Sequence, residues 1–190
     1  MASEIRLDNR VAIVTGGGAG LGRSHALLMA ARGAKVVVND LGGRVDGTGM
    51  SQAAADAVVA EIKAAGGAAV PDYNTVATPE GARSILQTAL EAYGTVDIVV
   101  NNAGILRFKR LLEHTPEDFA INLGVHLSGS YYVSMAAFPI MKEKRYGRFV
   151  FTSSSGGMRG SADGVAYGAA KAGVVGLANV MALAGARYSQ

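Results

Sequence analysis

The stretch that decides the fold is Thr15-Gly16-Gly17-Gly18-Ala19-Gly20-Leu21-Gly22. It follows an apolar run typical of a buried strand, 11–14, and it precedes a segment, 23–32, whose apolar residues suit a helix. A glycine-rich turn between a strand and a helix is the usual context of a dinucleotide phosphate site. Small residues let the backbone approach a pyrophosphate, and the helix N-terminus offers unpaired N–H groups to the anion. The stretch predicts dinucleotide binding, with an unrelated tight loop as the alternative.

An acidic residue follows at a suitable distance. Asp40 ends the next expected strand and lies 18 residues past Gly22, near the spacing of ~20 at which such sites place a carboxylate on a ribose hydroxyl. This carboxylate would repel a 2′-phosphate, so we expect NAD rather than NADP as the cofactor. Arg23 and Arg44 are the counter-evidence, because either side chain has the length and charge to bind that phosphate.

Composition excludes several classes of protein. The 190 residues suit one domain, 1–190, and 49% hydrophobic residues with 26 glycines suit an α/β protein. The chain has no cysteine and three scattered histidines, so we expect neither disulfides nor a metal. A net charge of +3 does not argue for nucleic acid. Because no apolar run reaches ~18 residues and residues 1–6 lack a signal peptide's apolar segment, we expect a cytoplasmic protein without a membrane segment.

Strands and helices are expected to alternate along the chain. The sequence predicts strands at 10–15, 35–40, 68–73, 96–101 and 148–152, and helices at 20–32, 51–65, 79–93, 116–144 and 164–187. The helical region 116–144 is expected to continue despite Gly124, Gly129 and Pro139. This alternation predicts parallel βαβ units with right-handed crossovers.

Polar residues gather where the expected strands end. They are Thr15, Asp40, Asn74, Asn101-Asn102 and Ser153-Ser154-Ser155. Because ligands of open α/β sheets bind at the carboxyl ends of the strands, this shared edge predicts the binding site.

Tyr167 and Lys171 add chemistry to that edge. They are four residues apart near the start of the last expected helix, so both side chains share one face. An ammonium near a phenol favours the phenolate, and such a tyrosine exchanges a proton with an alcohol or ketone. Without a cofactor site this pair would be an ordinary surface pair; beside a nicotinamide it predicts proton transfer. The basic run Arg107-Phe108-Lys109-Arg110 has two interpretations, a solvated loop or an anion contact at a pocket mouth.

Taken together, these motifs resemble those of the short-chain dehydrogenase/reductase family. The matching residues are Thr15-Gly16-x-x-x-Gly20-x-Gly22, Asn101-Asn102-Ala103-Gly104, and Ser154 with Tyr167-x-x-x-Lys171. The resemblance covers almost the whole chain. It implies a Rossmann-type doubly wound parallel sheet with strand order 3-2-1-4-5, Tyr167 as general acid/base, Lys171 holding the ribose and tuning Tyr167, and Ser154, with Ser155 as runner-up, orienting the substrate.

The implied cofactor residues extend along the same edge. They are Thr15, Gly16, Gly18, Gly20, Leu21, Gly22, Asp40, Asn74, Thr75, Val76, Asn102, Ala103, Gly104, Tyr167 and Lys171. Two positions depart from the family pattern. His126 stands where many members carry an asparagine that supports a proton-relay water, so it is either a relay residue or a satisfied buried histidine. Asn74 stands where an aspartate often contacts the adenine, and its amide oxygen is still an acceptor.

A closer resemblance concerns the substrate. Asn39 through Gly43, Asn101 through Leu106, and Val125-His126-Leu127 are similar to the (3R)-hydroxyacyl-CoA dehydrogenase branch of the family, found in peroxisomal multifunctional enzymes of type 2 and in bacterial single-domain relatives. The resemblance implies NAD-dependent oxidation of a secondary alcohol, such as a 3-hydroxyacyl-CoA, by a homodimer or homotetramer. The alternatives are a ketone or steroid reductase of the same family and a non-catalytic dinucleotide-binding protein. Family members usually continue with two more strands, so we expect a chain truncated at its C-terminus or a pocket open on one side.

Overall fold

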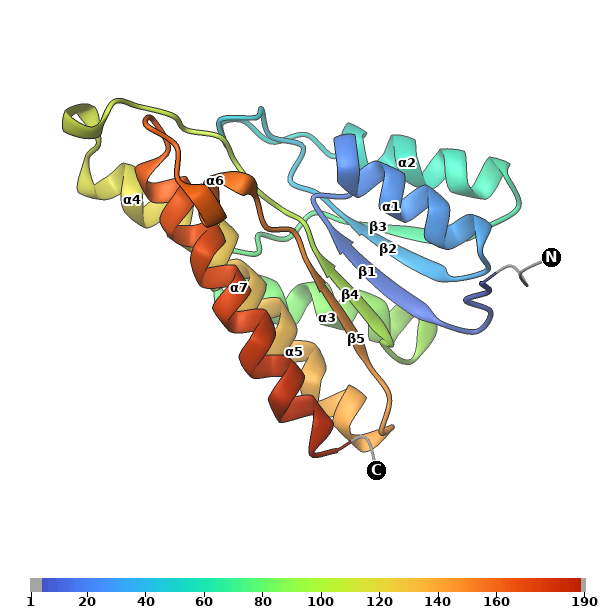
Figure 1. Ribbon diagram of the computed structural model, residues 1–190. Helices are drawn as coiled ribbons and strands as arrows, with labels where there is room; N and C mark the ends of the chain where they lie inside the picture. Colours follow the sequence, from blue (N-terminus) through green and yellow to red (C-terminus); the bar gives the residue numbers. More distant parts are fainter. Residues whose placement is uncertain (1–4, 189–190) are drawn as a thin grey trace.

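The computed structural model describes residues 5–188, and they form one parallel β-sheet with helices on both faces (Figure 1). The strands are β1 (Val11–Thr15), β2 (Lys35–Asn39), β3 (Ala68–Asp72), β4 (Ile98–Asn101) and β5 (Arg148–Phe151). Their order in the sheet is β3-β2-β1-β4-β5, which confirms the expected fold class and strand order. Residues 1–4, which belong to the expectation about residues 1–6, lie outside the described residues, and so do residues 189–190.

Seven α-helices connect or follow the strands in the described part of the chain. They are α1 (Gly20–Ala31), α2 (Ala53–Ala64), α3 (Pro79–Tyr93), α4 (Pro116–Leu123), α5 (Gly129–Glu143), α6 (Ser155–Arg159) and α7 (Val165–Ala186). In Figure 1, α1 and α2 cover one face of the sheet, and α3 and α5 cover the other, with α7 beside α5 along β5. This is the doubly wound arrangement that the alternating pattern predicts.

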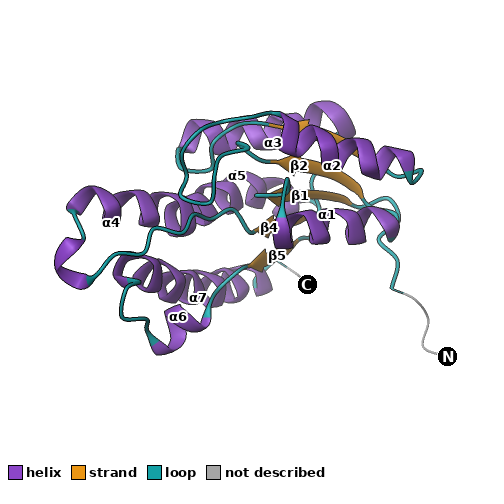
Figure 2. Ribbon diagram, turned by 90° about the horizontal axis from the view of Figure 1, so that it is seen from above, coloured by secondary structure: helices purple, strands orange, loops and turns teal. Residues whose placement is uncertain are grey.

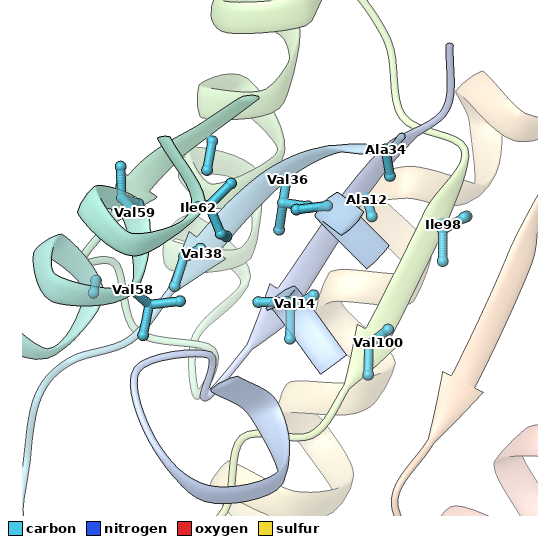
Figure 3. Packing of buried hydrophobic residues seen from close by; sticks show 14 residues of the cluster. Ala12, Val14, Ala34, Val36, Val38, Val58, Val59, Ile62, Ile98 and Val100 are labelled. Carbon is cyan, nitrogen blue, oxygen red and sulfur yellow. The ribbon is translucent and has the colours of Figure 1, made fainter. Parts of the chain in front are cut away.

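The core forms on both faces because the strands are apolar at nearly every position, as strands buried on both faces are. Residues of β1 alternate between the two faces: Ala12 and Val14 pack toward α1 and α2, whereas Val11 and Ile13 pack toward α3 and α5. Figure 3 shows the first cluster, in which Val58 and Ile62 of α2 reach the strands. Each fully buried valine or isoleucine contributes about 1.5–3 kcal/mol to folding, so this core fixes the positions of the strand ends.

The expected helical region 116–144 is confirmed, and the backbone stays helical at the junctions Leu123, Gly124 and Gly129, but the region contains a local irregularity. The helix α4 ends at Leu123, a π-helical turn covers Gly124–Ser128, and α5 then continues through Pro139. Two glycines of low helix propensity, Gly124 and Gly129, border this turn, and π-turns often occur at functional sites. The turn carries His126 inward, where its side chain is buried.

Two short helices were not predicted. A 3-10 helix covers Leu111–Glu113, and α6 begins directly after β5. The sequence Ser155-Gly156-Gly157 has the composition of a loop, but the Ser154 hydroxyl caps the helix by accepting a hydrogen bond from the Gly156 N–H at 3.1 Å. This cap is what turns the end of β5 into a helical turn.

By length and composition, α7 is the one helix among the described residues that would be long enough to cross a membrane. The same test is passed by packed helices of proteins without a membrane span. Because α7 packs against α4, α5, α6 and β5 and carries Lys171 among its buried residues, its length is no argument for a membrane span.

Candidate active site

The glycine turn has the geometry that a phosphate site needs. Gly16 has a φ of +63°, and a Cβ atom on it would lie 2.9 Å from the Ala103 Cα, so a larger residue does not fit. A Cβ atom on Gly22 would overlap the Gly16 carbonyl oxygen. At Ala19, no side chain of the described residues caps the start of α1. The first N–H groups of α1 are therefore left for an anion.

Thr15 and Asn102 hold this turn against the end of β4. The Thr15 hydroxyl donates to the Val100 carbonyl at 3.2 Å and accepts from the backbone N–H groups of Asn102 and Ala103 at 3.0 and 3.1 Å. The Asn102 amide donates back to the carbonyls of Thr15 and Gly16. Thr15 and Asn102, both predicted cofactor residues, thus fix the backbone of the glycine turn relative to the end of β4.

Asp40 lies beside the glycine turn. Its Oδ2 accepts from the Gly18 N–H at 2.8 Å and its Oδ1 accepts from the Gly42 N–H at 2.6 Å. Each carboxylate oxygen retains a further lone pair for a ribose hydroxyl. Leu21 is exposed in the first turn of α1, so its contribution to a cofactor would come from its backbone rather than its side chain.

A buried carboxylate that sequence reasoning missed organises the end of β3. Asp72 accepts hydrogen bonds from the side chains of Asn39, Asn74 and Thr88 at 2.7 to 2.8 Å and from the Asn74 N–H at 3.0 Å. Because the Asn74 Nδ2 is used by Asp72, its amide oxygen is the atom that remains as an acceptor. Nearby Val76 is buried against Gly129. The sequence signal for this cluster is an aspartate at the end of β3, with Asn74 two residues later and Asn39 at the end of the neighbouring strand.

Ser154 and Tyr167 share one small space. A Cβ atom on Gly156 would lie 3.6 Å from the Ser154 Oγ and 3.6 Å from the Tyr167 Cδ1 and Cε1 atoms. The Ser154 hydroxyl accepts from Gly156, so its proton remains free to donate. Ser155 is exposed, and the Ser153 hydroxyl donates to the Lys171 carbonyl at 3.1 Å. Of the three serines, Ser154 is the one placed beside the phenol ring.

Lys171 is buried between α7 and the end of β5. Its ammonium donates to the Thr152 carbonyl at 2.6 Å and lies 5.8 Å from the centre of the Tyr167 ring. Burial lowers the pKa of Lys171 to about 8, because a low-dielectric environment disfavours the charged form. The side chain still carries its charge at pH 7 and points toward the predicted catalytic tyrosine.

His126 lies edge-on to Tyr167, with ring centres 5.1 Å apart. Its Nε2 lies 2.8 Å from the Ile105 carbonyl oxygen, and its Nδ1 is buried without a hydrogen-bond partner among residues 5–188. Burial, and to a lesser extent the charge of Lys171, lower the pKa of His126 to about 4. A Cβ atom on Gly104 would lie 2.5 Å from the His126 Cε1, so the glycine after Ala103 is required by the imidazole.

The basic run 107–110 is not a free loop. The Arg107 Nε donates to the Asp46 carbonyl at 2.7 Å, and the Lys109 ammonium donates to Asp118 at 2.6 Å. This hydrogen bond lowers the pKa of Asp118 to about 2. Phe108 packs on Tyr167. Arg110 remains exposed, so an anion contact at this position stays a prediction.

A separate groove of about 630 Å³ lies between α5, β5 and the second half of α7. Phe138, Phe149, Met181 and Tyr188 are among its lining residues. None of the predicted site residues lines it, so the two regions are distinct. Figure 2 shows the loops that connect the strands to the helices.

Comparisons with known proteins identify the family of this chain. The family model described as short chain dehydrogenase matches residues 10–189, and the chain therefore belongs to the short-chain dehydrogenase/reductase family. A peroxisomal multifunctional enzyme type 2 of Drosophila melanogaster is 55% identical over 97% of this chain and 30% of its own length.

Two solved structures extend the comparison. A short chain dehydrogenase from Mycobacterium avium is 43% identical with a TM-score of 0.87, over 96% of this chain and 65% of that one. A 7α-hydroxysteroid dehydrogenase complexed with NADH and 7-oxo glycochenodeoxycholic acid is 28% identical with a TM-score of 0.88, over 97% of this chain and 68% of that one. The chain thus spans 30% of the fly enzyme and about two thirds of these shorter relatives.

Proposed function

We propose that this oxidoreductase uses NAD to oxidise a secondary alcohol, and that its substrate is a 3-hydroxyacyl thioester. The observation that carries the proposal is the meeting of Ser154, Tyr167 and Lys171 beside an uncapped helix N-terminus at one edge of the sheet. A non-catalytic dinucleotide-binding protein would have no need to keep these three groups together.

The residues at the glycine turn fit NAD. The pyrophosphate would lie against the N–H groups at the start of α1, and Asp40 would accept from the adenosine ribose. Asn74, Thr75 and Val76 would border the adenine, and Asn102, Ala103 and Gly104 would line the nicotinamide side. NAD supplies the hydride acceptor for the oxidation.

The remaining chemistry belongs to the protein. Ser154 donates a hydrogen bond to the substrate oxygen and so orients it. Tyr167 takes the alcohol proton as general base. Lys171 places a positive charge near the phenol, which favours the phenolate that this step needs.

We assign His126 a positioning role. The His126 Nε2 lies 2.8 Å from the Ile105 carbonyl oxygen and 3.2 Å from the Ile105 backbone nitrogen. We place the proton on Nε2 because the contact with the carbonyl oxygen is the shorter one, and this leaves Nδ1 as a buried acceptor. This tautomer fixes the segment that begins at Gly104 against the side of Tyr167. A water donating to Nδ1 would give His126 the relay role that the family's asparagine has at this position.

Two observations bear on the substrate. The 55% identical relative is a peroxisomal multifunctional enzyme, and a 38% identical relative from Synechocystis is a 3-oxoacyl-[acyl-carrier-protein] reductase, which favours an acyl thioester. The second candidate is a steroid or ketone reductase, favoured by the likeness to the 7α-hydroxysteroid dehydrogenase.

Steady-state assays decide between these candidates. Formation of NADH is measured with 3-hydroxyacyl-CoAs, hydroxysteroids and simple secondary alcohols. We expect the highest kcat/KM for a 3-hydroxyacyl-CoA. A preference for a hydroxysteroid would favour the second candidate, and NAD binding without turnover of any alcohol would indicate a binding protein.

Assembly and location complete the proposal. We propose a homodimer or homotetramer in the cytoplasm, and sedimentation and fluorescence microscopy test the two statements. The word peroxisomal in the names of several relatives makes accumulation in peroxisomes the competing result.

A further inference from the structure

The segment 105–109, between β4 and α4, is held by several hydrogen bonds although it is not a regular element. Leu106 donates its N–H to the Val45 carbonyl at 2.8 Å, and Lys109 donates its N–H to the Asp163 carbonyl at 3.0 Å. Side-chain bonds from His126, Arg107 and Lys109 add to these. The segment 105–109 therefore forms a bridge from the glycine-rich loop after β2 to the loop before α7.

Within this bridge, Phe108 makes no side-chain hydrogen bond, and its ring lies on Tyr167. The two ring centres are 5.6 Å apart with a tilt of 59°, a geometry that aromatic pairs prefer. A Cβ atom on Gly164 would lie 3.2 Å from the Phe108 Cε1. The Tyr167 ring thus contacts both Phe108 and His126.

Phe108 is nevertheless 49% exposed. The ring packs on Tyr167 and still presents a large apolar surface next to the phenol. Exposed apolar side chains continue along the same stretch at Leu106, Leu111 and Leu112. Exposed apolar side chains beside a polar site often serve binding, and a substrate whose hydroxyl reaches Tyr167 would lie near the Phe108 ring that packs on it.

We propose that Phe108 is a specificity-determining residue that contacts the apolar chain of the substrate and selects long acyl chains over short ones. The inference rests on the proposed function, because it concerns the group attached to the carbon that is oxidised. A single methylene in an apolar pocket changes kcat/KM by about 10-fold or more, so loss of a phenyl surface has a measurable effect on chain-length preference.

The test compares kcat/KM for short and long 3-hydroxyacyl-CoAs in wild type, Phe108→Ala and Phe108→Leu. We expect Phe108→Ala to lose about 10-fold on the long substrate and little on the short one, and Phe108→Leu to retain most of the preference. Tyr131→Ala is the matched control, because Tyr131 is also an exposed aromatic in a ring pair, on α5. Melting temperatures of all variants confirm that they fold.

Equal losses on both chain lengths would overturn the inference, because Phe108 would then only support Tyr167. Unchanged kinetics in Phe108→Ala would overturn it as well. If wild type oxidises 2-alkanols but no acyl-CoA, the proposed substrate is wrong. The ratio of kcat/KM for long and short 2-alkanols, measured in the same variants, then decides the role of Phe108. Inactivity on every alcohol would overturn both proposals.

Discussion

His126 shows how one side chain links the sequence pattern to packing. The family motif predicts an amide at this position, and an imidazole fills it instead, between Gly104 and Tyr167. The ring is buried with one nitrogen bonded to a carbonyl and the other without a partner in residues 5–188. An unprotonated imidazole fits this environment, whereas an imidazolium would be buried beside the Lys171 ammonium.

The first prediction follows from this buried imidazole. Its pKa falls from 6.5 to about 4 on folding, so the unfolded chain binds the proton first as pH drops. The free energy of unfolding should therefore decrease between pH 6.5 and pH 4 by about 3 kcal/mol from this group. Chemical denaturation across this pH range should show a shallower decrease in His126→Asn than in wild type.

His25→Asn is the control for this measurement, because His25 lies on α1 away from Tyr167 and has no bond to Ile105. Its pH profile should follow that of wild type. Identical profiles for wild type and His126→Asn would mean that His126 is not buried in its neutral form.

The second prediction concerns Asp40 and the preference for NAD over NADP. Its carboxylate faces the glycine turn, so NAD should bind more tightly than NADP, and Asp40→Ala should narrow the difference by removing the negative charge. Fluorescence titration of both cofactors into both proteins gives the four dissociation constants. Equal or tighter NADP binding by wild type would contradict the assignment and would point to Arg23 or Arg44 as a phosphate ligand.

At the scale of elements, the sequence predicts the strands and the long helices within about two residues, because period and capping are local properties. The π-turn inside the helical region 116–144 is different. It carries the His126 ring to Tyr167 and Gly104, and these contacts come from other parts of the fold, so a local sequence pattern does not predict them. Likewise, the residues of α6 favour a loop, but Ser154 caps the helix and α6 packs against α7.

The third prediction concerns this contact between α6 and α7. A Cβ atom on Gly157 would lie 2.7 Å from the Lys171 carbonyl carbon and Cβ, so Gly157→Ala should push α6 away and misplace Ser154 and Lys171. Turnover should fall by at least about 10-fold, because the groups that orient the substrate and transfer the proton would no longer be aligned. Steady-state kinetics with NAD saturating measures the loss.

Gly176→Ala is the matched control, because Gly176 is on α7 and a Cβ atom there meets nothing within 4 Å. Removing a glycine from a helix interior should raise the free energy of unfolding by about 0.5–1 kcal/mol and leave activity intact. Full activity in Gly157→Ala would show that the close approach of α6 to α7 does not position the site.

At the scale of the whole molecule, the two sheet edges differ. The β3 edge carries Pro71, which cannot donate to a further strand, whereas the described β5 strand has no proline and leaves Val150 exposed. The sequence of β5, apolar and without proline, is enough to predict that this edge is open to pairing with another strand. The position of the groove beside it depends on how α5 and α7 pack, which the sequence does not predict.

The fourth prediction is that the 190-residue chain associates or aggregates through the β5 edge. Light scattering should show particles larger than a monomer, and Val150→Lys should reduce them because a charge on an edge strand opposes pairing. Leu28→Lys, at an exposed apolar position on α1, is the control and should leave association unchanged. A monodisperse monomer of wild type would contradict the prediction.

The central claim is that a bound dinucleotide and Tyr167 act together at one edge of the sheet, and comparison of wild type with Tyr167→Phe tests it most directly. The substitution removes the exchangeable proton and keeps the ring that contacts Phe108 and His126. NADH formation in a single turnover with a 3-hydroxyacyl-CoA should fall by ~10²–10⁴-fold, while the dissociation constant for NAD changes little. A rate within a few-fold of wild type would contradict the claim.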